Sequence, residues 1–173
     1  MGRNYNIWSF AACIVILALS FQSLNATYTH SWLLAPPALG LWILTVITFV
    51  SGIRGFRDKS SRGARWRSWL TVLISFFLSA IFLLGVAVNT FARVPIETTQ
   101  SPDSNITIDF YTLNGGAATS ISVVGIVNGP LWFTKRIYFD DKMHKANVEW
   151  INNHIVSINK HTLDLDKGEI YSD

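Results

Sequence analysis

A long stretch near the N-terminus lacks fixed charge, which argues against a soluble N-terminal domain. Between Asn4 and Ile53 there is no Asp, Glu, Lys or Arg. Over the whole chain only 14% of residues are charged, against about 25% in a typical soluble domain. Because such a long uncharged stretch is hard to keep in water, the composition favours a membrane protein.

Cysteine and the common catalytic motifs are also scarce. Cys13 is the only cysteine, so no disulfide can form within the chain. Phosphate loops, dinucleotide loops and Gly-x-Ser-x-Gly motifs are missing, and no histidines stand at His-x-x-x-His spacing. We therefore expect no enzyme, no cofactor and no metal. The titratable residues of the C-terminal part are interpreted as solvated turn and edge residues: His144, His154, His161, Asp140, Asp141, Asp164 and Asp166.

Three long apolar runs are present, at residues 7–24, 32–50 and 70–92. Crossing a bilayer takes about 20 residues of helix, and backbone groups inside lipid must bond within their own segment. Each run is therefore predicted to be a transmembrane helix. The second helix is expected to begin after Pro37, with a proline kink as the alternative. The first is expected to stay in the mature protein, with a cleaved signal peptide as the alternative.

The segment between the second and third runs, residues 51–69, is strongly basic and is predicted to be a loop. It carries six Lys or Arg and a single acid, Asp58. Loops rich in Lys and Arg stay in the cytoplasm, which places the N-terminus inside and residues 93–173 outside the cell membrane. The same cations suit contact with anionic lipid headgroups, whereas nucleic acid is not an expected partner. They are Arg54, Arg57, Lys59, Arg62, Arg65 and Arg67.

The C-terminal part, residues 93–173, shows the period-two alternation of β-strands. Ile106, Ile108 and Phe110 alternate with polar residues, and Asn114-Gly115-Gly116 is a turn signal. Further strands are predicted within 119–127, 131–140, 147–151, 154–159 and 162–165, and a helical turn within 140–146. The expected fold is thus three transmembrane helices, residues 1–92, followed by a small antiparallel β-rich extracytoplasmic domain, residues 93–173.

Within this β-rich domain, Val148, Trp150, Val156 and Ile158 are predicted to face a common core from one hairpin. The aromatic block at 132–139 is either core or an exposed binding patch. The candidate binding surface combines that block with the neighbouring basic pair and an Asn-rich turn. Its residues are Trp132, Phe133, Lys135, Arg136, Asn152 and Asn153.

The motifs SPDSNITIDFY, GPLWFTKRIYF and VEWINNHIVSINKHTLDL make residues 93–173 resemble a domain family of unknown function. That family occurs in multi-pass membrane proteins of Gram-positive, Bacillus-type bacteria. The shared elements are a Ser-Pro-Asp start, a Gly-Gly turn, the Gly-Pro-Leu-Trp-Phe block and a Trp-x-x-x-x-x-Val-x-Ile-Asn ending. The resemblance implies a bacterial source and a membrane location, and it implies no activity.

Two functions are compatible with these patterns. The first is a membrane-anchored module whose outer domain binds a protein, peptide or wall component. The second is an accessory or immunity subunit whose helices dock onto another membrane protein. The expected partners are therefore the lipid bilayer and another membrane or envelope protein.

Overall fold

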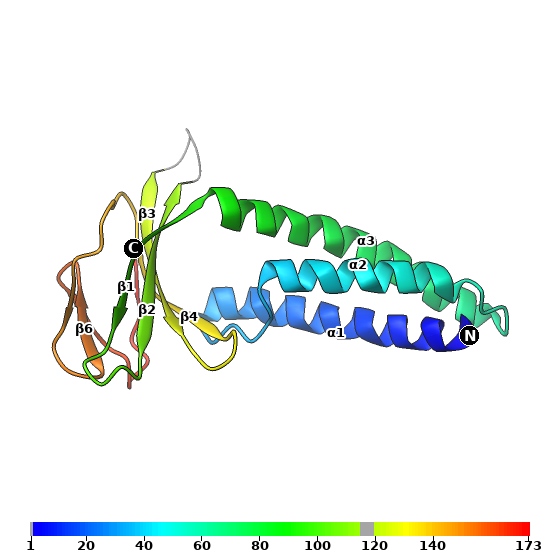
Figure 1. Cartoon of the computed structure of the whole chain (residues 1–173), viewed down its shortest axis with the longest axis horizontal. Coiled ribbons are helices and arrows are strands. Elements are labelled where there is room, and N and C mark those ends of the chain that lie inside the picture. The colour runs from blue at the N-terminus through cyan, green and yellow to red at the C-terminus, as the bar shows by residue number, and fades with distance from the viewer. Residues whose placement is uncertain (1, 115–119) are drawn as a thin grey trace. The chain divides into compact units, whose positions relative to one another are not determined.

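The structure is a computed structural model that describes residues 2–114 and 120–173 (Figure 1). The chain forms two compact units. The helix unit contains the chain up to Ser23 together with Ala35–Ala87, and the β unit contains Leu24–Leu34 together with Val88–Asp173. The predicted glycines of the Asn114 turn, Gly115 and Gly116, lie outside the described residues.

Three helices, α1 (Gly2–Thr29), α2 (Ala38–Gly55) and α3 (Arg62–Phe91), coincide with the three apolar runs. By length and composition all three can cross a membrane. Helix α2 begins directly after Pro37, whose carbonyl accepts a hydrogen bond from the Leu41 amide at 3.1 Å, as predicted. Helix α1 extends beyond the run 7–24 at both ends, and α3 begins well before the run 70–92. The flanking polar residues are thus helical as well.

The predicted basic loop at 51–69 is wrong over most of its length. Helix α2 continues to Gly55 and helix α3 already begins at Arg62, so the turn is confined to residues 56–61. Ser61 caps α3, since its hydroxyl oxygen accepts a hydrogen bond from the Ala64 amide at 3.1 Å. Most of the basic residues therefore occupy helix ends, where their spacing is fixed.

The helices of the helix unit pack through small residues. A Cβ atom at Gly52 would lie 3.0 Å from Cγ2 of Thr71. One at Gly55 would lie 2.9 Å from Oγ of Ser68 and 3.2 Å from Cα of Asn6. Such close backbone approach is how helices associate in lipid, where burial of apolar surface gives no advantage.

The β unit contains two sheets. The first has five strands in the order β1-β2-β3-β4-β8, in which β1 to β4 are antiparallel and β8 runs parallel to β4. The second is an antiparallel sheet of order β5-β6-β7. The strands are β1 (Arg93–Gln100), β2 (Thr107–Asn114), β3 (Ile121–Asn128), β4 (Thr134–Asp140), β5 (Val148–Trp150), β6 (Ile155–Ile158), β7 (His161–Asp164) and β8 (Tyr171–Ser172).

The two sheets share one hydrophobic core, and the predicted alternation is confirmed there. Ile108 and Phe110 of β2 are fully buried, as are Val156 and Ile158 of β6. The half-buried Val148 and Trp150 pack against this core beside their partners in β6.

Three features of the β unit differ from the predictions. Strands β1 and β8 were not foreseen, because β1 is exposed over nearly all its length and β8 has only two residues. Residue 140 ends strand β4, and residues 141–146 form a turn and irregular chain instead of a helical turn. Asp140 is buried, because β4 runs on to this residue and places it on the same face as Tyr138.

Candidate functional site

The basic segment Arg54–Arg67 gathers at the α2–α3 turn. Arg54 is in the last turn of α2, Arg57 and Lys59 are in the turn itself, and Arg62, Arg65 and Arg67 are in the first turns of α3. All are exposed except Arg67, which is half-buried. Neither ion pair formed by the described residues involves any of these six cations.

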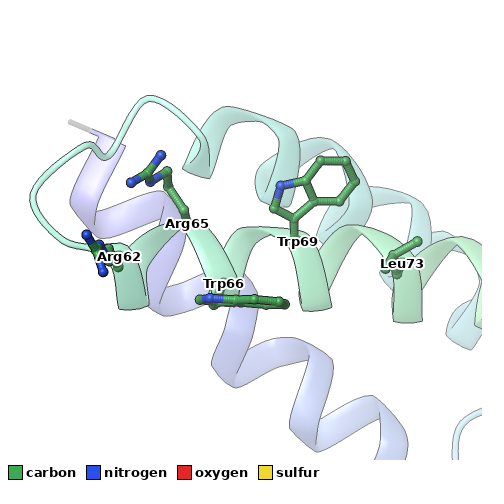
Figure 2. A pocket seen from close by; sticks show the side chains of 5 residues that line it. All are labelled: Arg62, Arg65, Trp66, Trp69 and Leu73. Carbon is green, nitrogen blue, oxygen red and sulfur yellow. The ribbon is translucent and has the colours of Figure 1, made fainter.

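The side chains of Arg62, Arg65, Trp66, Trp69 and Leu73 surround a hollow of about 430 Å³ (Figure 2). These residues are spaced three or four apart along α3, so their side chains lie on the same side of its first turns. Figure 2 shows the two guanidinium groups at the start of the helix and the two indoles farther along it.

Both indoles beside this hollow are open to the surroundings. Trp66 is 68% exposed and Trp69 is 55% exposed, while the ring of Phe56 packs edge-on against Trp69 with centroids 5.4 Å apart. Exposed Trp next to Arg is typical of a helix end in the headgroup layer, where the indole is half in hydrocarbon and the cation meets lipid phosphate.

Arg67 has a structural contact that sequence reasoning missed. The fully buried Asn6 donates from Nδ2 to the carbonyl oxygen of Ala64 at 2.6 Å and to Oγ of Ser68 at 2.7 Å. Its Oδ1 accepts from Nε of Arg67 at 2.8 Å. Asn6 therefore joins α1 to α3 and holds the Arg67 guanidinium against the helix unit. Only the polarity of Asn6 beside an apolar run signals this in the sequence.

The residues of the predicted binding surface come from the chain just before β4, from β4 itself and from the β5–β6 turn. Trp132 is 45% exposed, and its Nε1 donates to the carbonyl oxygen of Leu34 at 2.9 Å. Phe133 is half-buried and meets Trp132 edge-on. Asn152 accepts from the amides of His154 and Ile155 and so forms the β5–β6 turn.

Lys135 and Arg136 were predicted as a pair, and the structure separates them. Successive residues of a strand point to opposite faces. Nζ of Lys135 donates to the carbonyl oxygen of Gly168 at 3.4 Å, whereas Nη2 of Arg136 lies 3.3 Å from Nδ1 of His30. The aromatic block likewise divides, since Tyr138 is fully buried and Phe139 is half-buried under the Arg136 guanidinium.

The titratable residues of the β unit are dispersed. The Tyr138 hydroxyl donates to Oδ2 of Asp140 at 2.6 Å, and His154 pairs with Asp166 at 3.1 Å. The His161 ring stacks on Tyr171 at 3.7 Å. Within residues 2–114 and 120–173 no three His, Cys, Asp or Glu come together as metal ligands. The absence of enzymatic activity stays a prediction.

Fold and site together define a class: three apolar helices able to cross a membrane, followed by a β-rich unit of two sheets. The chain belongs to a family of unknown function, DUF5412, whose profile matches residues 66–173. The match covers the β strands and nearly all of α3. Searches of curated proteins and of solved structures gave no match.

Proposed function

We propose that this chain is an integral membrane protein of the bacterial cell membrane that presents its β unit outside the cell as a binding module. In this orientation the N-terminus and the α2–α3 turn are cytoplasmic. The observation that carries the proposal is the exposed cluster Arg57, Lys59, Arg62 and Arg65, which has no carboxylate partner among the described residues and adjoins two exposed indoles.

The charge of the chain supports this orientation. Residues 94–173 carry ten Asp or Glu against six Lys or Arg, so the β unit is acidic while the α2–α3 turn is basic. Cations near a span end resist translocation and are attracted to anionic lipid by about 1 kcal/mol each. Acidic residues have little influence on the direction of insertion, so the acidic charge of the β unit does not prevent its transfer across the membrane.

Cysteine labelling in intact cells tests the orientation. In a Cys13→Ala background, Ser172→Cys is expected to react with a membrane-impermeant maleimide. Ser60→Cys is expected to react only after the cells are permeabilised. Both serines are exposed, so access to the reagent decides the result. Labelling of Ser60→Cys in intact cells, with Ser172→Cys protected, would reverse the proposed orientation.

The second candidate, a subunit that docks onto another membrane protein, is favoured by a groove between α1 and α2. The groove has a volume of about 570 Å³. The small or hydroxyl-bearing residues Ser9, Ala12 and Thr48 line it together with the large side chains of Tyr5, Trp8 and Ile47. In lipid, faces with small and hydroxyl side chains promote helix association.

Photo-crosslinking in native membranes tests this docking. A crosslinking residue at Ala12 is expected to give one discrete protein adduct, which Thr48→Leu should abolish by filling the groove. The same residue at Ile81 on α3, which is exposed and outside the groove, is the control. Equal adducts from both positions, or none from Ala12, would exclude docking at the groove.

A further inference from the structure

A segment that precedes α2 completes the β unit. Residues 24–34 belong to this unit, and the Leu33 amide donates to the carbonyl oxygen of Thr134 at 2.8 Å. The Thr134 amide donates in turn to the Leu33 carbonyl oxygen at 3.3 Å, so the two residues form an antiparallel β-bridge. Trp32 packs so closely on Gly129 that a Cβ there would lie 2.6 Å from the indole.

This segment encloses a hollow of about 170 Å³ against the five-stranded sheet. Three nitrogen-bearing side chains line it: His30 from the segment, Arg93 from β1 and Arg136 from β4. Ser31 and Thr134 also line it and carry hydroxyl groups. Its remaining lining is largely apolar, with Leu33, Leu113, Val124 and Ile126.

The hollow holds positive charge without a counter-charge. None of its lining residues is acidic, and neither arginine takes part in an ion pair of the described residues. Partial burial lowers the pKa of Arg93; the nearby Tyr111 opposes this effect, and the charge of Arg136 adds to it. Asp109 is on the same face of β2 as Leu113, but its carboxylate already accepts from Thr98 and Asn128, both at 2.6 Å.

Two guanidinium groups that share a partly desolvated hollow repel each other unless an anion lies between them. Guanidinium binds phosphate and carboxylate oxygens through paired N–H donors. The hollow is smaller than the roughly 300–1,000 Å³ of a small-molecule pocket, so it suits a compact anionic group. Its position favours phosphate, because Thr27 lies in the last turn of α1 and Arg93 follows α3 within two residues. Thr27 and Arg93 thus lie next to the ends of apolar helices. The end of a membrane-spanning helix lies at the level of the lipid phosphates.

We propose that His30, Arg93 and Arg136 form a binding site for a phosphate group, either in a phospholipid headgroup or in a free phosphate ester. The inference deepens the proposed function, and rests on it, by assigning a ligand class to the β unit. Phosphate binding is measured on purified protein, so its failure leaves the cell-labelling result on orientation unaffected.

The test uses the full chain in a non-ionic detergent that contains no phosphate. Inorganic phosphate and glycerol phosphate form one arm, and short-chain phosphatidylglycerol in mixed micelles forms the other. Binding is followed by calorimetry at matched ionic strength. Arg93→Gln is the main variant, because no side-chain hydrogen bond of the described residues joins Arg93 to the covering segment 24–34, so its loss leaves that segment in place. Lys135→Gln is the matched control, since it removes a neighbouring charge that does not line the hollow.

We expect Arg93→Gln to weaken phosphate binding at least tenfold and Lys135→Gln to leave it within twofold of the wild type. Arg136→Lys keeps the charge and loses the planar fork, so it should weaken binding by less than Arg93→Gln. Binding in both arms indicates a free phosphate ester as sufficient ligand, and binding only in the lipid arm indicates a headgroup. Absence of binding in both arms, or equal weakening by Lys135→Gln and Arg93→Gln, would overturn the proposal.

Discussion

Tyr138 is a residue whose environment makes the β unit sensitive to alkali. It is fully buried, its hydroxyl donates to Asp140, and Asn159 donates to that hydroxyl at 3.2 Å. Burial, followed by the hydrogen bond to Asp140, raises the pKa of Tyr138 far above its ordinary value. Because the pKa is raised in the folded state, the Tyr138 hydroxyl of the unfolded chain loses its proton at a lower pH than that of the folded chain. The contribution of Tyr138 to stability is therefore complete below about pH 10 and declines as the pH rises above it.

We predict that Tyr138→Phe flattens this alkaline loss of stability. The variant should also be less stable at neutral pH by about 1–3 kcal/mol, because the buried Asp140 loses a donor. Pulse proteolysis across a urea series, at pH 7 and at pH 10.5, measures both effects. Tyr28→Phe is the control, because Tyr28 is 82% exposed. An unchanged pH dependence in Tyr138→Phe would show that other groups cause the loss.

Asn6 gives the second prediction at this scale. Asn6→Ala removes the hydrogen bonds to the Ala64 carbonyl, the Ser68 hydroxyl and the Arg67 guanidinium. Hydrogen bonds between membrane helices are worth about 0.6 kcal/mol each on average, so the loss should be about 2 kcal/mol. The thermal midpoint in detergent should fall for Asn6→Ala and stay constant for Asn4→Ala, whose side chain is exposed. Equal midpoints for both variants would contradict the structural role of Asn6.

At the scale of elements, the contact between helices depends on Gly55. A methyl group there meets Oγ of Ser68 at 2.9 Å and the backbone of Asn6 at 3.2 Å, so Gly55→Ala forces the helices apart. Overpacking of this kind costs about 1–3 kcal/mol. Gly63→Ala is the matched control: its methyl group meets nothing closer than 3.8 Å, and alanine favours helix. In detergent, the aggregation temperature should be lower than that of the wild type for Gly55→Ala and unchanged or higher for Gly63→Ala.

The elements also show what the sequence could predict. Uncharged runs indicated the helices, and alternation at Ile108 and Phe110 indicated a half-buried strand, because both signals are local. The bounds of α3 depend on the cap at Ser61, which hydropathy does not detect. The separation of Lys135 from Arg136 follows from strand period, yet what each contacts depends on distant residues such as His30 and Gly168.

At the scale of the whole molecule, the α2–α3 turn is predicted to set the orientation. Replacing Arg57, Lys59, Arg62 and Arg65 together by Gln removes most of the exposed charge of this turn. The chain should then insert in both directions, because Lys and Arg near span ends determine which loops stay inside. Labelling at Ser60→Cys and Ser172→Cys would show a mixed population. Replacing Lys142, Lys145, Lys160 and Lys167 by Gln is the control and should leave one orientation.

The bridge between Leu33 and Thr134 has a consequence for the order in which the protein is made. Residues 24–34 leave the ribosome long before β4, yet they are part of the same folded unit. In the proposed orientation, the first two helices are inserted, with their connection on the same side as the β strands, before those strands complete their fold. Residues 93–173 expressed alone should be degraded rapidly by protease. A synthetic peptide of residues 24–34, added in trans, should restore part of their resistance.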